Sequence, residues 1–116
     1  MNANSTPVDS TMQRVAFKLR IKNNAIEEYE RDHRAVWPEL LAKLKQVGIS
    51  DYSIFRRGQD LILVMKVTDF DFAWQQLAND PVNLSWQEKM AKYFEPVPDL
   101  KPSERFAMLT EVFYME

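Results

Sequence analysis

Hydrophobic and polar residues alternate along the first ordered stretch of the chain, between residues 12 and 22. Its apolar positions fall on every second residue, and basic residues occupy the positions between them. A period of two is typical of a strand with one buried face, because successive side chains of a strand point to opposite sides. The apolar side of this predicted strand consists of Val15, Phe17, Leu19 and Ile21.

The next segment, residues 26–47, has apolar residues at helical spacing, and Gly48 is placed to end the helix. Pro38 lies inside this segment. Its ring clashes with the preceding turn of an α-helix, so we expect a bend or a restart near Trp37.

The second half of the chain repeats the succession of strands and helices. Predicted strands cover residues 51–57 and 61–67 and are joined by a short turn at 58–60. Asp69 is expected to cap a helix over 70–78, and Asp80 with Pro81 to begin another over 82–94. The final segment, 105–115, is apolar on both sides and is predicted to be the last strand.

The order strand–helix–strand–strand–helix–strand predicts a ferredoxin-like α+β fold. We expect a single domain over residues 12–116, preceded by a flexible polar tail at residues 1–11. Helices cover one face of such a sheet, yet the strand at 61–67 is apolar on both faces. An open apolar sheet face indicates an interaction surface, and a homodimer that packs sheet against sheet would cover it.

The composition and charge of the chain exclude several classes of function. The 116 residues include 15 basic and 17 acidic side chains with the two signs interspersed, which argues against nucleic-acid binding and against an anionic membrane surface. The absence of cysteine excludes disulfides, thiol nucleophiles and cysteine-based metal sites. Only carboxylate-rich metal sites remain possible, and no spaced acidic cluster is present. No early apolar run resembles a signal peptide, so the expected location is cytoplasmic.

The most reactive candidate is His33, the single histidine of the chain. It follows Tyr29 by four residues and precedes Trp37 by four, so the three side chains share one stripe of a helix. An imidazole titrates near neutral pH and suits general acid–base catalysis. The pattern alone also fits a surface histidine, and aromatic stripes more often belong to the core. The same two interpretations apply to Tyr52 and to Trp86.

Several motifs together resemble the L-rhamnose mutarotase family, from about residue 14 to residue 116. They are Tyr-Glu-Arg-Asp-His at 29–33, Trp-Pro-Glu-Leu at 37–40, Gly-Ile-Ser-Asp-Tyr-Ser-Ile-Phe at 48–55, Trp86, and Glu-Val-Phe-Tyr at 111–114. The resemblance implies a dimeric α+β barrel that interconverts the α and β anomers of deoxy-sugars without a cofactor or a metal. It also implies that His33 is the proton donor, that Tyr29 and Tyr52 bind the sugar, and that Trp86 lines the pocket.

Two segments depart from the pattern of rhamnose-specific members. Those members typically have a second tryptophan where this chain has Gln87, and a different loop where this chain reads Glu-Pro-Val-Pro-Asp-Leu-Lys-Pro at 95–102. The pattern of Trp86 with Met90 and the Pro-Val-Pro at 96–98 are more similar to members associated with L-fucose. The predicted substrate is therefore L-rhamnose or L-fucose, with Gln87 among the sugar-binding residues. Two alternatives differ in class: a non-catalytic dimeric barrel that binds a small apolar or aromatic ligand, and a cofactor-free oxygenase of similar fold.

Overall fold

Strands and helices follow one another in the predicted order in the structure, a computed structural model that describes residues 12–116. The predicted tail at residues 1–11 lies outside the described residues. The elements are β2 (Gln13–Arg20), a 3₁₀ turn (Asn23–Ala25), α1 (Ile26–His33), α2 (Pro38–Gln46), β3 (Ile49–Arg57), β4 (Asp60–Val67), α3 (Phe70–Ala78), α4 (Pro81–Ala91) and β5 (Ala107–Met108).

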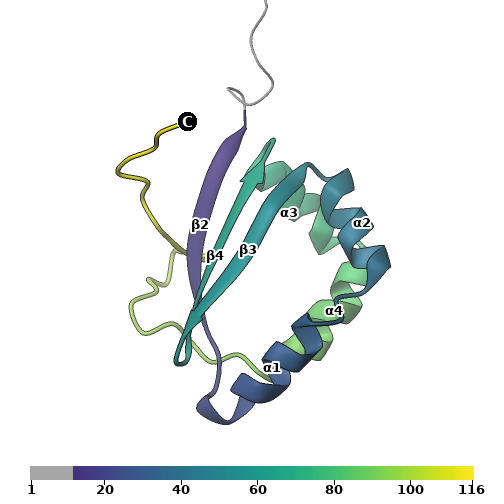
Figure 1. The fold of residues 1–116 in the computed structure, drawn as a ribbon, viewed down its shortest axis with the longest axis vertical. Helices are drawn as coiled ribbons and strands as arrows, with labels where there is room; N and C mark the ends of the chain where they lie inside the picture. Colours follow the sequence, from purple (N-terminus) through teal and green to yellow (C-terminus); the bar gives the residue numbers. More distant parts are fainter. Residues whose placement is uncertain (1–11) are drawn as a thin grey trace, which may run out of the picture.

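The strands form one antiparallel sheet in the order β3-β4-β2-β5. The two central strands, β4 and β2, pair along their whole lengths, with Phe17 opposite Leu63. All four helices lie on one side of this sheet (Figure 1). The result is a two-layer arrangement in which one sheet face is covered, so the predicted ferredoxin-like α+β fold is confirmed.

The core lies between the sheet and the helices and follows from the alternation in the sequence. Every second residue of β4 is buried, and the residues between them are half-buried or exposed. The same face of β2 contributes Phe17, which is 1% exposed. The main buried core residues of the strands and helices are Phe17, Ile21, Tyr29, Leu40, Ile49, Leu61, Leu63, Met65, Val67, Leu77, Trp86 and Met90.

The predicted interruption near Trp37 is confirmed, because α1 ends at His33 and α2 begins at Pro38. Proline is tolerated at the first helical position, where its missing N–H would have no partner within the helix. The aspartate caps are also confirmed: Asp69 accepts a hydrogen bond from the N–H of Phe72 and Asp80 from that of Asn83. Within the described part of the chain, no helix is both long enough and apolar enough to span a bilayer.

The prediction of a long final strand over 105–115 is wrong. Only Ala107 and Met108 pair with β2, and one further backbone bond joins the N–H of Leu109 to the carbonyl of Ala16. Beyond that point side chains, not backbone, hold the segment: Arg14 binds Glu111 at 2.7 Å and lies over the ring of Tyr114. Most of the apolar side chains that suggested a strand, from Met108 to Met115, are exposed in this single chain, so apolar side chains on both sides did not ensure pairing.

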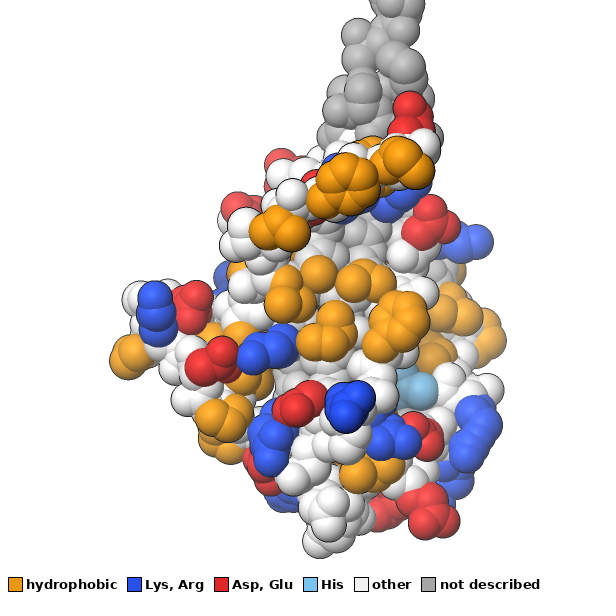
Figure 2. Space-filling model, turned by 60° about the vertical axis from the view of Figure 1, so that its left-hand side comes forward, with side chains coloured by type: hydrophobic (Ala, Val, Ile, Leu, Met, Phe, Trp, Pro, Cys, Tyr) orange, Lys and Arg blue, Asp and Glu red, His pale blue; other side chains and the backbone are white. Residues whose placement is uncertain are grey.

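The sheet face opposite the helices carries a patch of apolar side chains. These side chains occupy two neighbouring rows across β3, β4, β2 and the residue after β5. We call them the open-face patch, which consists of Ala16, Phe55, Ile62, Val64 and Leu109. Phe55 is 60% exposed and Leu109 43%. Hydrophobic side chains gather in the middle of this side of the molecule, with charged side chains around them (Figure 2). The predicted open apolar face is therefore present in the described structure.

Candidate active site

A cavity of about 670 Å³ lies between the covered sheet face and the helices. A second hollow of about 400 Å³ continues it toward α2. All five site residues predicted from the sequence line the first cavity, although they come from α1, β3 and α4: Tyr29, His33, Tyr52, Trp86 and Gln87. All of them except Tyr29 also line the second, so the two hollows share a wall made of these side chains.

His33 is the last residue of α1, and its ring is held by a hydrogen bond to its own helix. Nδ1 lies 2.8 Å from the carbonyl oxygen of Tyr29. A carbonyl can only accept, so Nδ1 carries the proton in this bond. The neutral ring then has its lone pair on Nε2, and that nitrogen is free to accept a proton from a bound molecule.

Aromatic rings hold the imidazole on two sides. The ring of Tyr29 lies 4.1 Å from that of His33, centroid to centroid and inclined by 30°, and the edge-on ring of Trp86 lies at 5.4 Å. Trp37 packs edge-on against Trp86 at 5.1 Å. Trp37 therefore supports the wall of the site from behind, while Tyr29 and Trp86 restrict the direction of the imidazole.

Burial lowers the pKa of His33 below its ordinary value of 6.5, because the charged imidazolium loses water. The carbonyl of Tyr29 and the carboxylate of Asp32 act in the opposite direction and offset part of this effect. The neutral, proton-accepting form of His33 therefore predominates at neutral pH.

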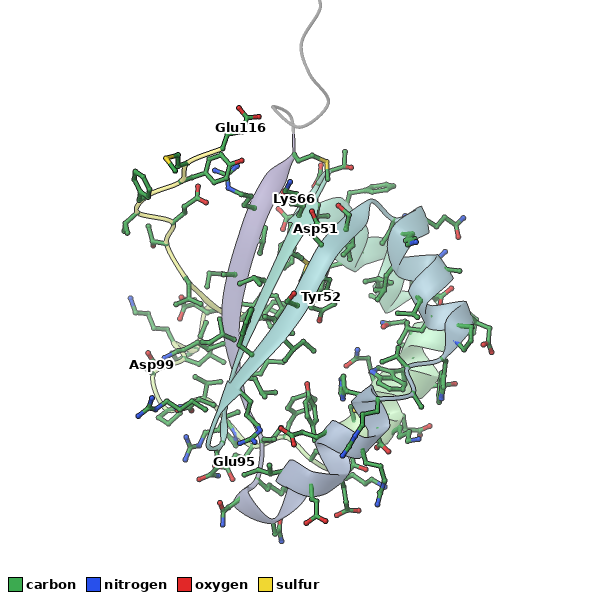
Figure 3. All side chains as sticks on the ribbon, in the orientation of Figure 1. Asp51, Tyr52, Lys66, Glu95, Asp99 and Glu116 are labelled. Carbon is green, nitrogen blue, oxygen red and sulfur yellow. The ribbon has the colours of Figure 1, made fainter. Side chains whose placement is uncertain are left out.

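Tyr52 faces the cavity because of a β-bulge in β3. Ser50 pairs with Lys66, and Ser53 pairs with Val64. Between these two pairs β3 has two residues, whereas β4 has only one, so β3 contains one extra residue. At the bulge, the backbone of Asp51 has a positive φ of 47°. The carboxylate of Asp51 lies 3.6 Å from the amine of Lys66 (Figure 3). The extra residue brings Tyr52 onto the covered face.

The two phenols of the site are protonated over the whole physiological range. Burial of the hydroxyl ends raises the pKa of Tyr29 and of Tyr52 well above the ordinary value of 10. Within the described residues, neither hydroxyl has a hydrogen-bond partner from the protein that would stabilise its anion. Buried hydroxyl groups usually find a partner, so two such phenols in a cavity suit a ligand that is rich in hydroxyl groups.

Asn83 and Trp74 line both hollows but were not predicted as site residues. Asn83 is 8% exposed; its amide donates to the carbonyl of Leu77 at 3.0 Å, and its oxygen lies 3.4 Å from the amide nitrogen of Gln87. The spacing of α4 contained a signal for it, since Asn83 precedes Trp86 by three residues and Gln87 by four. For Trp74 the sequence offered only an aromatic residue in an amphipathic helix.

The described residues contain no group of three or more histidine, cysteine or acidic side chains arranged to hold a metal ion. The chemistry that this geometry supports by itself is proton transfer by one imidazole beside protonated phenols, in a cavity walled by an indole.

Comparisons with known proteins agree with the geometry. The family model described as L-rhamnose mutarotase matches residues 14–115. An L-rhamnose mutarotase of Bacteroides thetaiotaomicron is 37% identical over 90% of this chain and 100% of its own length. An L-fucose mutarotase of Xanthomonas campestris is 36% identical over 89% of this chain and 88% of its own.

Solved structures give the same assignment. The crystal structure of an L-rhamnose mutarotase from Formosa agariphila matches with a TM-score of 0.72 at 35% identity, over 90% of this chain and 99% of that one. Tetracenomycin F2 cyclase of Streptomyces glaucescens matches with a TM-score of 0.56 at 20% identity, over 90% and 96% of the two chains, which shows a shared fold alone. The matched family model, together with these relatives, shows that this chain belongs to the L-rhamnose mutarotase family.

Proposed function

We propose that this protein is a mutarotase that interconverts the α and β anomers of a 6-deoxy-hexose. The observation that carries the proposal is the arrangement at His33. Its Nδ1 is occupied by the carbonyl of Tyr29, which leaves Nε2 free in a cavity with two protonated phenols and the indole of Trp86. These are groups that suit a polyhydroxylated ring with one apolar face.

The reaction needs one proton removed and one added, with no net change. Nε2 of His33 takes the proton of the anomeric hydroxyl, and the imidazolium gives this proton to the ring oxygen as the bond between that oxygen and the anomeric carbon breaks. The open-chain aldehyde rotates about its first carbon–carbon bond, and the hydroxyl then adds to the other face of the carbonyl. During closure His33 takes the proton of that hydroxyl and gives it to the former aldehyde oxygen, so the imidazole ends neutral. The hydroxyls of Tyr29 and Tyr52 bind the sugar, and Trp86 packs against its apolar face.

Saturation-transfer NMR tests the proposal directly. One anomeric proton is saturated, and the loss of signal from the other anomer measures the exchange rate with and without protein. Exchange of L-rhamnose or L-fucose faster than in buffer supports the proposal. Binding of either sugar without faster exchange of any sugar would contradict it and favour a non-catalytic binding protein.

The choice between the two sugars depends on Gln87 in this proposal. Its amide and that of Asn83 form a polar edge to the cavity, at the position where rhamnose-specific members typically carry a tryptophan. We expect Gln87→Trp to shift the ratio of the two sugars' kcat/KM toward L-rhamnose by about tenfold, because a bulky apolar ring replaces a hydrogen-bonding amide. Exchange rates for both sugars with each variant measure this ratio, and Gln87→Asn, which keeps the neutral amide in a shorter side chain, serves as the control. An unchanged ratio in Gln87→Trp would exclude Gln87 from sugar selection.

The rate should depend on pH through His33. Its pKa is lowered by burial, so the base stays available at neutral pH, and the rate should fall only as the pH drops below 6.5. Stability should fall in the same window, because the unfolded chain binds a proton at His33 at higher pH than the folded chain does. The exchange rate as a function of pH and the NMR titration of the single histidine measure the midpoint of activity and the pKa, and thermal unfolding at the same pH values measures the stability. A midpoint above 6.5 in either would contradict this prediction.

We further propose that the protein forms a homodimer through the open-face patch, and that residues 12–116 constitute its single catalytic domain. Support comes from the exposed aromatic ring of Phe55 and from the exposed apolar side chains of the C-terminal segment, Val112, Phe113 and Met115, which one protomer leaves uncovered. A cytoplasmic location stays a prediction from composition.

A further inference from the structure

One part-buried hydrogen bond joins the helix that carries His33 to Tyr93, which lies two residues beyond the end of α4, the helix that carries Trp86. The hydroxyl of Tyr93 donates to Oδ2 of Asp32 at 2.7 Å, across 61 residues of sequence. The Asp32 side chain is 10% exposed and Tyr93 is 4% exposed. Because Asp32 directly precedes His33, this bond acts on the last turn of α1.

Tyr93 is itself firmly held. Its N–H donates to the carbonyl of Met90 at 2.9 Å, and its own carbonyl accepts from the N–H of Lys22 at 2.8 Å. Its ring stands edge-on to Tyr29, with 6.3 Å between the ring centroids, and Tyr29 is the residue that stacks on His33. Tyr93 therefore contacts the turn of α1 that holds the imidazole in two ways, through a hydrogen bond and through a ring.

We propose that Asp32 and Tyr93 are positioning residues for the reaction: their hydrogen bond fixes the last turn of α1 against the end of α4 and so sets His33 at its working distance from Trp86. This inference rests on the proposed function, because it assigns these two residues a part in proton transfer at His33. A displacement of about 1 Å at a reacting group can lower the rate by orders of magnitude. A hydrogen bond that fixes the position of His33 therefore affects the reaction rate.

Asp32 also supplies the negative charge next to the imidazole. The hydrogen bond from Tyr93 holds the pKa of Asp32 below its usual range, so the carboxylate is charged at neutral pH. Nζ of Lys89 lies 3.9 Å and Nε of Arg31 4.0 Å from Oδ1 of Asp32. Other charged side chains that line a hollow together with His33 are Glu30 of α1, Arg34 directly after it, Lys45, Asp51, Arg56 and Arg105, and the titratable phenols there are Tyr29 and Tyr52.

Three variants separate the hydrogen bond from the charge. Tyr93→Phe removes only the donor hydroxyl, Asp32→Asn keeps an acceptor oxygen for Tyr93 but removes the charge, and Asp32→Ala removes both. Glu28→Gln is the matched control. It removes an exposed carboxylate from the same helix, and that carboxylate lies 3.8 Å from the guanidinium of Arg31. Anomer exchange gives kcat and KM, thermal unfolding checks the fold, and proton NMR of the single histidine gives the pKa of His33.

We expect Tyr93→Phe to lower kcat about tenfold with little change in KM, because the sugar-binding groups remain while the imidazole loses its fixed position. Asp32→Asn should retain most of kcat and should lower the pKa of His33, because the neighbouring anion is gone. Asp32→Ala should show both effects, so the asparagine variant rescues the position but not the charge. Glu28→Gln should behave like the unmodified protein.

The inference is overturned if Tyr93→Phe and Asp32→Ala match Glu28→Gln in kcat and in the pKa of His33. A drop in kcat that is equal for Asp32→Asn and Asp32→Ala would also overturn it, because the hydrogen bond would then have no effect of its own. If the unmodified protein exchanges no sugar, the proposed function fails instead. The pKa of His33 in the asparagine and alanine variants still reports whether Asp32 acts on the imidazole.

Discussion

Replacing His33 with alanine is expected to reduce the enzymatic exchange of sugar anomers by about 10²- to 10⁴-fold, which is the range that a positioned acid–base group contributes. The chain has no second histidine, and the phenols near the site are held protonated by burial, so neither phenol can replace the imidazole as a base near neutral pH. Saturation-transfer NMR measures the rate above the buffer background.

Two controls separate loss of the acid–base group from loss of structure. His33→Asn places an amide nitrogen at the same distance along the side chain as Nδ1, so it can donate to the carbonyl of Tyr29. It does not titrate, so it should be as inactive as the alanine variant. Added imidazole should restore part of the exchange in His33→Ala by entering the space left beside Trp86. Exchange near the unmodified rate in either variant would rule out His33 as the acid–base group.

The second large effect is expected on the oligomeric state of the protein. Phe55→Asp should convert the proposed homodimer to a monomer at micromolar concentration, because a symmetric interface would bring two uncompensated carboxylates into an apolar contact. A cost of about 3 kcal/mol would weaken the dimer by about two orders of magnitude. Light scattering with sedimentation measures the mass.

Phe72 offers a matched control for this substitution. It lies on α3, on the helical side of the sheet, and is 53% exposed, compared with 60% for Phe55. Phe72→Asp introduces the same charge at similar exposure but away from the open-face patch, so it should leave the mass unchanged. A monomeric unmodified protein, or a dimer that survives Phe55→Asp, would contradict the proposed interface.

The sequence determined the order of the elements and most of their ends. Alternation over β2 and β4, the proline at the start of α2, and the aspartate caps of α3 and α4 are local signals, because each depends on residues within one or two turns or on one face of a strand. The spacing of Tyr29 and His33 likewise needed only one helix. The resemblance to the family, and the departure from it at Gln87, added Tyr52, Trp86 and Gln87 to the predicted site but not Asn83 or Trp74.

Only the tertiary structure decided how those residues meet and how the last segment ends. The bulge at Asp51 that turns Tyr52 inward depends on the register between β3 and β4, and the bond between Tyr93 and Asp32 joins residues far apart in the chain. The final segment has strand-like composition yet forms a two-residue strand, since apolar side chains do not by themselves bring the backbone into pairing with β2. Local patterns determine which elements form, whereas the direction of a side chain and the neighbours it meets depend on contacts that no single segment contains.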